Sequence, residues 1–182
     1  LAHNNPIQTL KNRRASTILT PHLGEFRRLF PNIDTQQIDT QQIDTQQIDP
    51  AFSEKMPGEA AQKAAQASGA IVLLKGARSM IAAGARLWFN PHSTPALARG
   101  GSGDVLTGLM GGLVAAAAKD THLSHQQRAS ESAVLTPAVI SAVWWHSQAA
   151  LYATRQRTLL GVDPLILARS LNPALNELRA LS

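Results

Sequence analysis

The residues best placed to do chemistry lie in one short run, where glycines and a carboxylate lead into an apolar segment. Gly100, Gly101 and Gly103 surround Ser102, and Asp104 follows directly. A glycine-rich turn at the start of a helix points several backbone N–H groups at one spot, at the positive end of the helix dipole. Phosphate binds well there, and Asp104 stands where it could take a proton from a hydroxyl beside that phosphate.

The segment after this turn favours an anion site, because it has the pattern of a packed helix. Its apolar residues share one helical face, and Gly108, Gly111 and Gly112 allow close packing. The residues of that face are Val105, Leu106, Leu109, Met110, Leu113 and Val114. A tight loop before a buried helix is the alternative, since glycine is also common in turns.

Composition limits the classes of protein that the chain can represent. With 182 residues, 44% of them hydrophobic, one domain with a real core is expected. The absence of cysteine excludes disulfides and thiolate metal sites, and agrees with a cytoplasmic location. A net charge of +5 suits anionic partners such as nucleotides. The basic residues are scattered without interleaved aromatics, and no apolar stretch is long enough for a bilayer. Neither nucleic acid nor a membrane is therefore an expected partner.

Strand and helix patterns alternate along the chain, which predicts an α/β layered sheet. The run 71–74 is typical of a strand covered on both faces, and 79–83 with 86–90 indicate a hairpin. A further strand is expected at 17–20, and helices at 5–14, 24–30, 57–68, 137–154 and 163–171. Ligands of such sheets bind beyond the carboxyl ends of strands, where the loops of Thr20, Lys75 and Gly100 would lie.

Two polar segments carry no expected chemistry. Residues 34–49 contain three copies of Thr-Gln-Gln-Ile-Asp and are expected to form a flexible surface insertion, and 119–136 a surface loop. His122, His125 and His146 lack a metal-ligand spacing on one firm element, so no metal site is expected among them. His146, beside two tryptophans on a helix, is expected to be a packed core histidine.

Three loops together resemble one enzyme family. The motifs TPHLGE at 20–25, VLLKGA at 72–77 and GGSGDVLTG at 100–108 resemble those of the ADP- or ATP-dependent NAD(P)H-hydrate dehydratases. The resemblance extends from about residue 14 to 175. It implies the ribokinase-like fold, with helices on both faces of a layered sheet. It also implies repair of the hydrated cofactors NADHX and NADPHX at the expense of a nucleotide phosphate.

The resemblance assigns the catalytic roles to the glycine-rich turn. A nucleotide phosphoryl group would move to the C6 hydroxyl of the hydrated nicotinamide ring, and phosphate would then be eliminated. Asp104 would be the base that takes the hydroxyl proton. The amides of Gly101, Ser102 and Gly103 would stabilise charge on the transferring group.

The binding residues implied by the resemblance come from all three motifs. The nucleotide, ADP or ATP with Mg²⁺ held largely by phosphates and water, would contact the stretch after the buried strand together with Gly103. That stretch is Lys75, Gly76, Ala77, Arg78 and Ser79. His22 and Asp104 would contact the hydrated dinucleotide. Judged from the residues alone, His22 could instead cap the following helix. Family members form oligomers, so a homo-oligomer is expected.

Two departures leave other interpretations open. Leu1-Ala2 resembles the continuation of a family segment, Asp-Ala-Asp-Ala-Leu-Asn, so the first strands and any fused epimerase domain would precede residue 1. Residues 94–99 also differ from the family's Asn-Pro-Gly-Met-Ala run. The chain could therefore be a truncated remnant without activity. It could also be another ribokinase-like enzyme that phosphorylates a vitamin precursor or a sugar.

Overall fold

The computed structural model describes residues 6–35, 50–119 and 128–180 of the chain. The chain divides into two compact units, one of residues 1–89 with 123–133 and the other of residues 90–122 with 134–182. Each unit has a hydrophobic core of its own.

The sheet has the strand order β1-β2-β3-β4. Its strands are β1 (Ile18–Leu19), β2 (Ile71–Leu74), β3 (Ser79–Ala83) and β4 (Arg86–Asn90). β1 pairs with β2 in parallel, Ile18 opposite Ile71, and β2 pairs with β3 antiparallel, Leu73 opposite Ile81. Gly84, with φ +58°, provides the left-handed residue of the turn between β3 and β4. The predicted hairpin is therefore confirmed.

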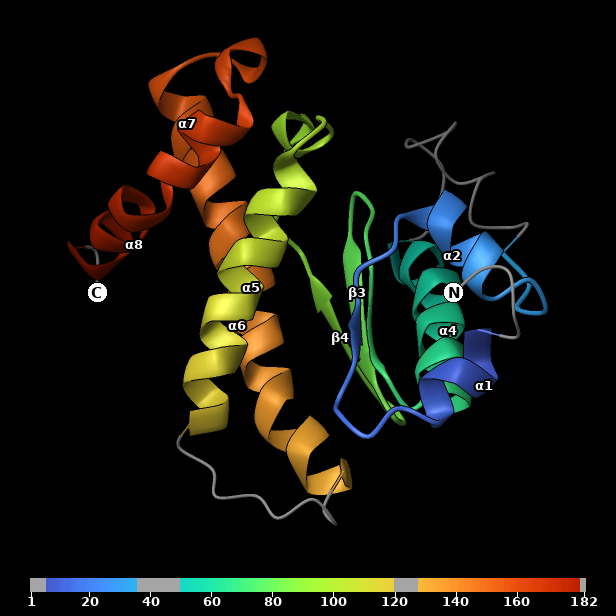
Figure 1. The fold of residues 1–182 in the computed structure, drawn as a ribbon. Coiled ribbons are helices and arrows are strands. Elements are labelled where there is room, and N and C mark those ends of the chain that lie inside the picture. The colour runs from blue at the N-terminus through green and yellow to red at the C-terminus, as the bar shows by residue number, and fades with distance from the viewer. Residues whose placement is uncertain (1–5, 36–49, 120–127, 181–182) are drawn as a thin grey trace. The chain divides into compact units, whose positions relative to one another are not determined.

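Three described helices lie wholly in the first unit: α1 (Pro6–Lys11), α2 (Leu23–Leu29) and α4 (Pro50–Ser68). α4 lies along β2 and β3 (Figure 1). It presents Ala60, Ala61, Ala64 and Ala65, which pack with Val72, Leu74, Met80 and Ala82 of the sheet. The alternate residues Ile71, Leu73 and Ile81 are also buried. Both faces of β2 are therefore covered, as predicted for 71–74, and β3 is buried on both faces as well.

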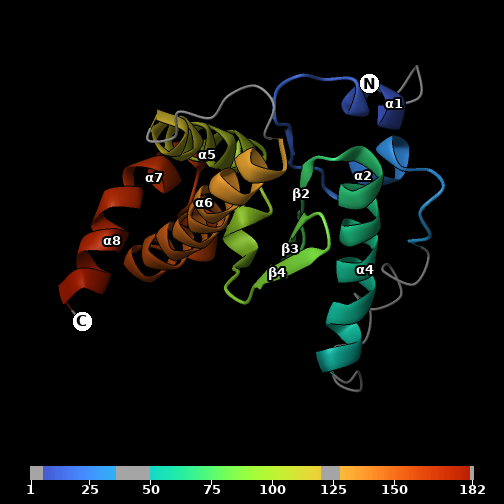
Figure 2. The ribbon, with the colours of Figure 1, turned by 90° about the horizontal axis from the view of Figure 1, so that it is seen from below.

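The second unit is mainly helical. Its longer helices are α5 (Ser102–Lys119) and α6 (Arg128–Gln156, of which 134–156 belong to this unit), followed by α7 (Pro164–Arg169) and α8 (Leu171–Ala180). α5 and α6 run side by side in both views (Figures 1 and 2). Two short 3-10 helices, η1 (Pro95–Leu97) and η2 (Leu159–Gly161), lie in the connections. The Trp145 indole N–H donates to the Leu171 carbonyl at 2.8 Å, which ties α6 to α8.

The largest differences from the predicted helix boundaries occur at three places, while α1 ends at Lys11 rather than at residue 14. The predicted surface loop is wrong for 128–136, which form the first turns of α6, with Pro137 inside the helix. α4 begins at Pro50 rather than at Pro57. The chain also continues after α7 into α8, which the sequence did not predict. α8 forms although it contains Pro173, and it places Leu171 and Ala174 in the core of the second unit. Residues 36–49 and 120–127, which hold most of the repeat and His122 and His125, lie outside the described residues.

No helix in the described ranges is both long and apolar enough to cross a membrane. In the same ranges, no three His, Cys, Asp or Glu side chains are grouped so that they could hold a metal ion.

Candidate functional site

In the first unit, the parallel pairing of β1 and β2 brings two of the sequence motifs together. The Lys75 N–H donates to the Pro21 carbonyl at 2.9 Å, and His22 and Lys75 form an isolated parallel bridge. Both residues follow the carboxyl end of their strand, which is where ligands of α/β sheets bind. The loops of TPHLGE and VLLKGA are therefore neighbours in the fold.

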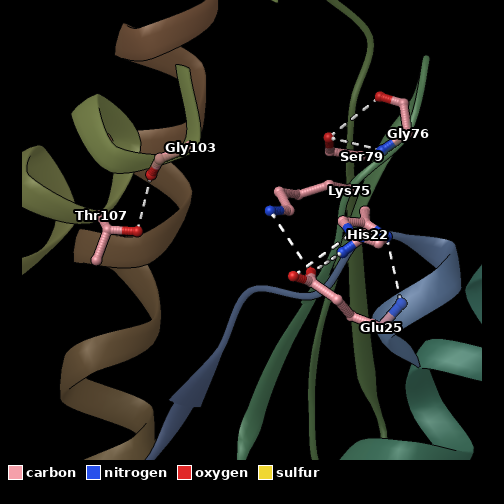
Figure 3. Close-up of polar contacts among 7 residues, drawn as sticks. All are labelled: His22, Glu25, Lys75, Gly76, Ser79, Gly103 and Thr107. Atoms are coloured by element: carbon pink, nitrogen blue, oxygen red, sulfur yellow. Dashed lines mark hydrogen bonds and ion pairs between the residues drawn. The ribbon is translucent and has the colours of Figure 1, made fainter. Parts of the chain in front are cut away.

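His22 caps α2 in a reciprocal arrangement with Glu25 (Figure 3). The Glu25 N–H donates to His22 Nδ1 at 3.2 Å, and the His22 N–H donates to Glu25 Oε2 at 2.8 Å. The capping interpretation of His22 is confirmed. Since 55% of the His22 side chain remains exposed, capping leaves the ring accessible to a ligand.

Glu25 connects His22 with Lys75 and was not among the predicted site residues. Its carboxylate lies 3.4 Å from His22 Nε2 and 3.9 Å from Lys75 Nζ. The hydrogen bond from the His22 backbone N–H lowers the pKa of Glu25 most strongly. Burial opposes this shift, and the nearby His22, Lys75 and Arg28 side chains lower the pKa further. A glutamate three residues after a helix cap was the sequence signal for this contact.

The residues after Lys75 form an exposed turn into β3. Ser79 closes it, because its hydroxyl donates to the Gly76 carbonyl at 3.4 Å and accepts from the Gly76 N–H at 3.5 Å (Figure 3). Gly76, Ala77 and Arg78 are exposed in this turn. A phosphate-bearing ligand can therefore approach the backbone here without displacing core residues.

In the second unit, the glycine-rich run forms the predicted turn into a helix. Gly101 has φ +86°, and α5 begins at the next residue. The Ser102 N–H donates to Arg99 O at 3.2 Å and the Asp104 N–H to Gly101 O at 3.1 Å. Within the described part of the chain no acceptor is seen for the amide of Gly103. Of the three amides expected to hold phosphate, that of Ser102 is thus engaged in the turn, whereas those of Gly101 and Gly103 have no acceptor among the described residues.

Asp104 lies exposed in the first turn of α5, where the helix dipole favours negative charge. The Thr107 hydroxyl donates to the Gly103 carbonyl at 2.8 Å one turn further on (Figure 3). An exposed carboxylate beside an available amide suits a nucleotide phosphate with Mg²⁺, because Mg²⁺ takes oxygen ligands and keeps several waters.

His146 of α6 is buried, as predicted, and it contacts the glycine-rich turn, which the sequence did not reveal. Its Nε2 lies 3.0 Å from the Ser102 carbonyl oxygen. Burial lowers the pKa of His146 to about 4, against the opposing effect of its bond to Ser102. The ring is therefore neutral near pH 7, and since its partner is a carbonyl, Nε2 carries the hydrogen and donates it.

The next residue of α6, Ser147, contacts Asn90, which is the first residue of the segment 90–102 that ends at Ser102. The Asn90 side-chain amide donates to Ser147 Oγ at 2.7 Å and to the His92 carbonyl at 2.8 Å. Asn90 is buried, and its Oδ1 has no hydrogen-bond partner in the described structure. α6 thus contacts both ends of the segment 90–102.

The predicted site residues therefore form two groups. His22 and 75–79 lie in the first unit, and 101–104 in the second. Within each unit the members are brought together by backbone hydrogen bonds. The pairing of His22 with Asp104 around one ligand stays a prediction.

Comparisons with known proteins agree on one family. A sequence profile described as NAD(P)H-hydrate dehydratase matches residues 1–173. The bifunctional NAD(P)H-hydrate repair enzyme Nnr of Thermosynechococcus vestitus is 49% identical over 164 residues, which cover 90% of this chain and 26% of that enzyme.

Solved structures show the same relationship. An ADP/ATP-dependent NAD(P)H-hydrate dehydratase from Bacillus subtilis, co-crystallized with ATP/Mg²⁺, matches with TM-score 0.64 and 25% identity, over 89% of this chain and 48% of its own. A ribokinase-like superfamily protein from Enterococcus faecalis, 19% identical, shares the fold with TM-score 0.56, over 94% of this chain and 50% of its own. The ribokinase-like α/β fold class is confirmed. This chain spans about half the length of these solved structures and a smaller part of the repair enzyme.

Proposed function

This chain belongs to the NAD(P)H-hydrate dehydratase family, and from that premise we propose that it carries the dehydratase site that restores NADH and NADPH from NADHX and NADPHX. The nucleotide ADP, or ATP, supplies the phosphoryl group. The observation that carries the proposal is the turn 100–104, in which a left-handed glycine, an available amide and an exposed carboxylate adjoin the start of α5.

The proposed reaction has two steps. The terminal phosphoryl group of the nucleotide moves to the C6 hydroxyl of the hydrated ring, and Asp104 accepts the hydroxyl proton. Phosphate then leaves from C6, and loss of a ring proton restores the double bond of the dihydronicotinamide. The amide of Gly103 and the positive end of the α5 dipole stabilise negative charge on the moving group.

The first unit supplies the binding residues of the proposal. The Lys75 ammonium and the backbone of 76–79 bind nucleotide phosphates, and the exposed imidazole of His22 contacts the hydrated dinucleotide. Support comes from the position of these residues at the carboxyl ends of β1 and β2. Mg²⁺ would arrive with the nucleotide, held largely by phosphates and water, and would reduce the charge on the phosphates; Asp104 is the carboxylate that the turn 100–104 would offer it.

Two measurements on this chain and on Asp104→Asn test the proposal. Mg-ADP should raise the melting temperature of both proteins, because the substitution leaves the amide and Lys75 in place. With NADPHX and ADP, only the chain with Asp104 should release phosphate and regain the near-ultraviolet absorbance of the reduced nicotinamide.

Other outcomes separate the remaining interpretations. A stable phosphorylated product without phosphate release would identify a ribokinase-like kinase. A chain that does not melt cooperatively, or does not respond to Mg-ADP, would be a remnant that cannot act alone. A homo-oligomer and a cytoplasmic location belong to the same proposal, and light scattering and cell fractionation test them.

A further inference from the structure

We infer that His146 is a positioning residue, which orients the Gly103 amide by holding the carbonyl group of Ser102. The inference rests on the proposed function in one respect, namely that the Gly103 amide binds phosphate. The contact itself does not depend on any ligand. It joins two residues that are 44 positions apart in the sequence.

The argument begins with the geometry of one peptide group. The carbonyl of Ser102 and the N–H of Gly103 belong to the same planar, trans unit, in which C=O and N–H point in opposite directions. Whatever fixes the carbonyl therefore fixes the N–H. His146 Nε2 lies 3.0 Å from the Ser102 oxygen, within the ordinary range for a hydrogen bond.

Burial makes this contact specific. His146 and Ser102 are only 5% and 4% exposed, so water does not compete for the bond. The Gly103 amide, on the opposite side of the same peptide group, has no acceptor in the described part of the chain. One side of the peptide is thus held by the protein, and the other is left for a ligand.

The neutral state of the ring supports the assignment. Because burial keeps the pKa of His146 near 4, the ring carries one hydrogen at neutral pH. The bond to the Ser102 carbonyl places that hydrogen on Nε2. A neutral ring can thus donate to the Ser102 carbonyl without placing a buried positive charge next to the turn.

The neighbouring residue Ser147 also holds the segment 90–102 against α6. It bonds Asn90 at 2.7 Å, so consecutive residues of α6 hold the first and last residues of the segment 90–102. The Gly101 turn, with its left-handed φ of +86°, lies directly before the peptide that His146 holds.

The experiment compares His146→Leu, which removes the donor, with His146→Gln, whose amide nitrogen can take the position of Nε2. The first readout is the backbone order parameter of Gly103 from nitrogen-15 relaxation, which needs no ligand. It should fall in the Leu variant and stay at the wild-type value in the Gln variant. The second is the Kd of Mg-ADP, which should rise about tenfold in the Leu variant alone, the effect of losing one aligned donor to a charged group.

His92→Gln is the matched control, because it replaces an exposed histidine of the same unit. It should change neither readout. Unchanged Gly103 order and Mg-ADP affinity in His146→Leu would overturn the inference. If the Leu variant does not fold, His146→Asn replaces it, because the shorter asparagine side chain does not reach Ser102. The Asn variant should then show the lower Gly103 order parameter and the weaker Mg-ADP binding. If wild type does not bind Mg-ADP, the proposed function fails, and the Gly103 order parameter still decides the role of His146.

Discussion

Gly101 and Pro164 lie so close together that residue 101 has no room for a side chain. A Cβ at this position would lie 2.6 Å from Pro164 Cγ and 3.2 Å from its Cβ, both atoms of a rigid ring. Pro164 is the first residue of α7, and Gly101 directly precedes α5. The starts of two helices therefore meet at the glycine-rich turn.

Gly101→Ala should lower the free energy of unfolding by about 2–5 kcal/mol, the sum of a left-handed backbone penalty and an overpacked contact. Urea unfolding followed by tryptophan fluorescence measures the change. The matched control is Gly100→Ala, where nothing lies within 4 Å of the new Cβ. It should alter the free energy of unfolding by only about 0.5 kcal/mol. Equal losses in the two variants would contradict the close contact.

His146 should make stability depend on pH. The folded pKa of about 4 lies below the ordinary value of 6.5, so between these values the unfolded chain binds a proton that the folded chain does not. The free energy of unfolding therefore falls as pH drops from 6.5 to about 4, by about 3 kcal/mol from this group. Its contribution is level above and below that window.

Denaturant unfolding of wild type and His146→Gln across this pH range isolates the effect. The difference in unfolding free energy between the two proteins should change with pH, because glutamine does not titrate. A constant difference would show that His146 is protonated as readily in the fold as in the unfolded chain.

Glu25→Ala should cost about 0.5–2 kcal/mol of unfolding free energy, because the N–H of His22 loses its acceptor at the start of α2. Glu25→Gln keeps an acceptor oxygen and should cost less at neutral pH. Since folding lowers the pKa of Glu25, the advantage of the carboxylate is present above its ordinary pKa of 4.5 and is lost as pH falls through the lower folded value. Wild type and the Gln variant should therefore converge in acid. If the two proteins still differ in unfolding free energy in acid, the charge of the Glu25 carboxylate is not the cause of the difference.

Lys75→Met should weaken Mg-ADP binding by about tenfold at low salt, and by less at high salt, because the ammonium acts on phosphate through charge. Isothermal titration calorimetry at two salt concentrations measures both effects. Lys63→Met is the control, since Lys63 is an exposed lysine of α4. Similar losses in both variants would indicate a general charge effect rather than a site at Lys75.

Local patterns predicted the elements whose signals are contained within a few residues. The hairpin 79–83 and 86–90 has the predicted bounds, because strand patterning and Gly84 specify it locally. The start of α5 also follows from its glycines. The first turns of α6 were missed, since they begin with polar residues and Pro137 follows 128–136. Helix formation there depends on the rest of α6 rather than on local propensity.

The candidate site divides in the same way. The motif residues were predicted from a resemblance. The neighbourhood of His22 and Lys75 follows from the parallel pairing of β1 with β2, two strands that were expected at 17–20 and 71–74. The contact of His146 with Ser102 had no local signal, because a hydrogen bond across 44 residues depends on how two helices pack. The sequence also contained no sign that Asn90 Oδ1 would be buried without a hydrogen-bond partner among the described residues.

The alanine face of α4 has a consequence for how the first unit tolerates change. Ala60, Ala61, Ala64 and Ala65 lose no side-chain rotamer freedom on folding, so this seam forms at little entropic cost. The same methyl groups leave no flexible chain that could move aside for a larger neighbour. Substitutions along the seam should therefore reduce the amount of folded protein in a cell, while the molecules that do fold keep the chemistry of the wild type.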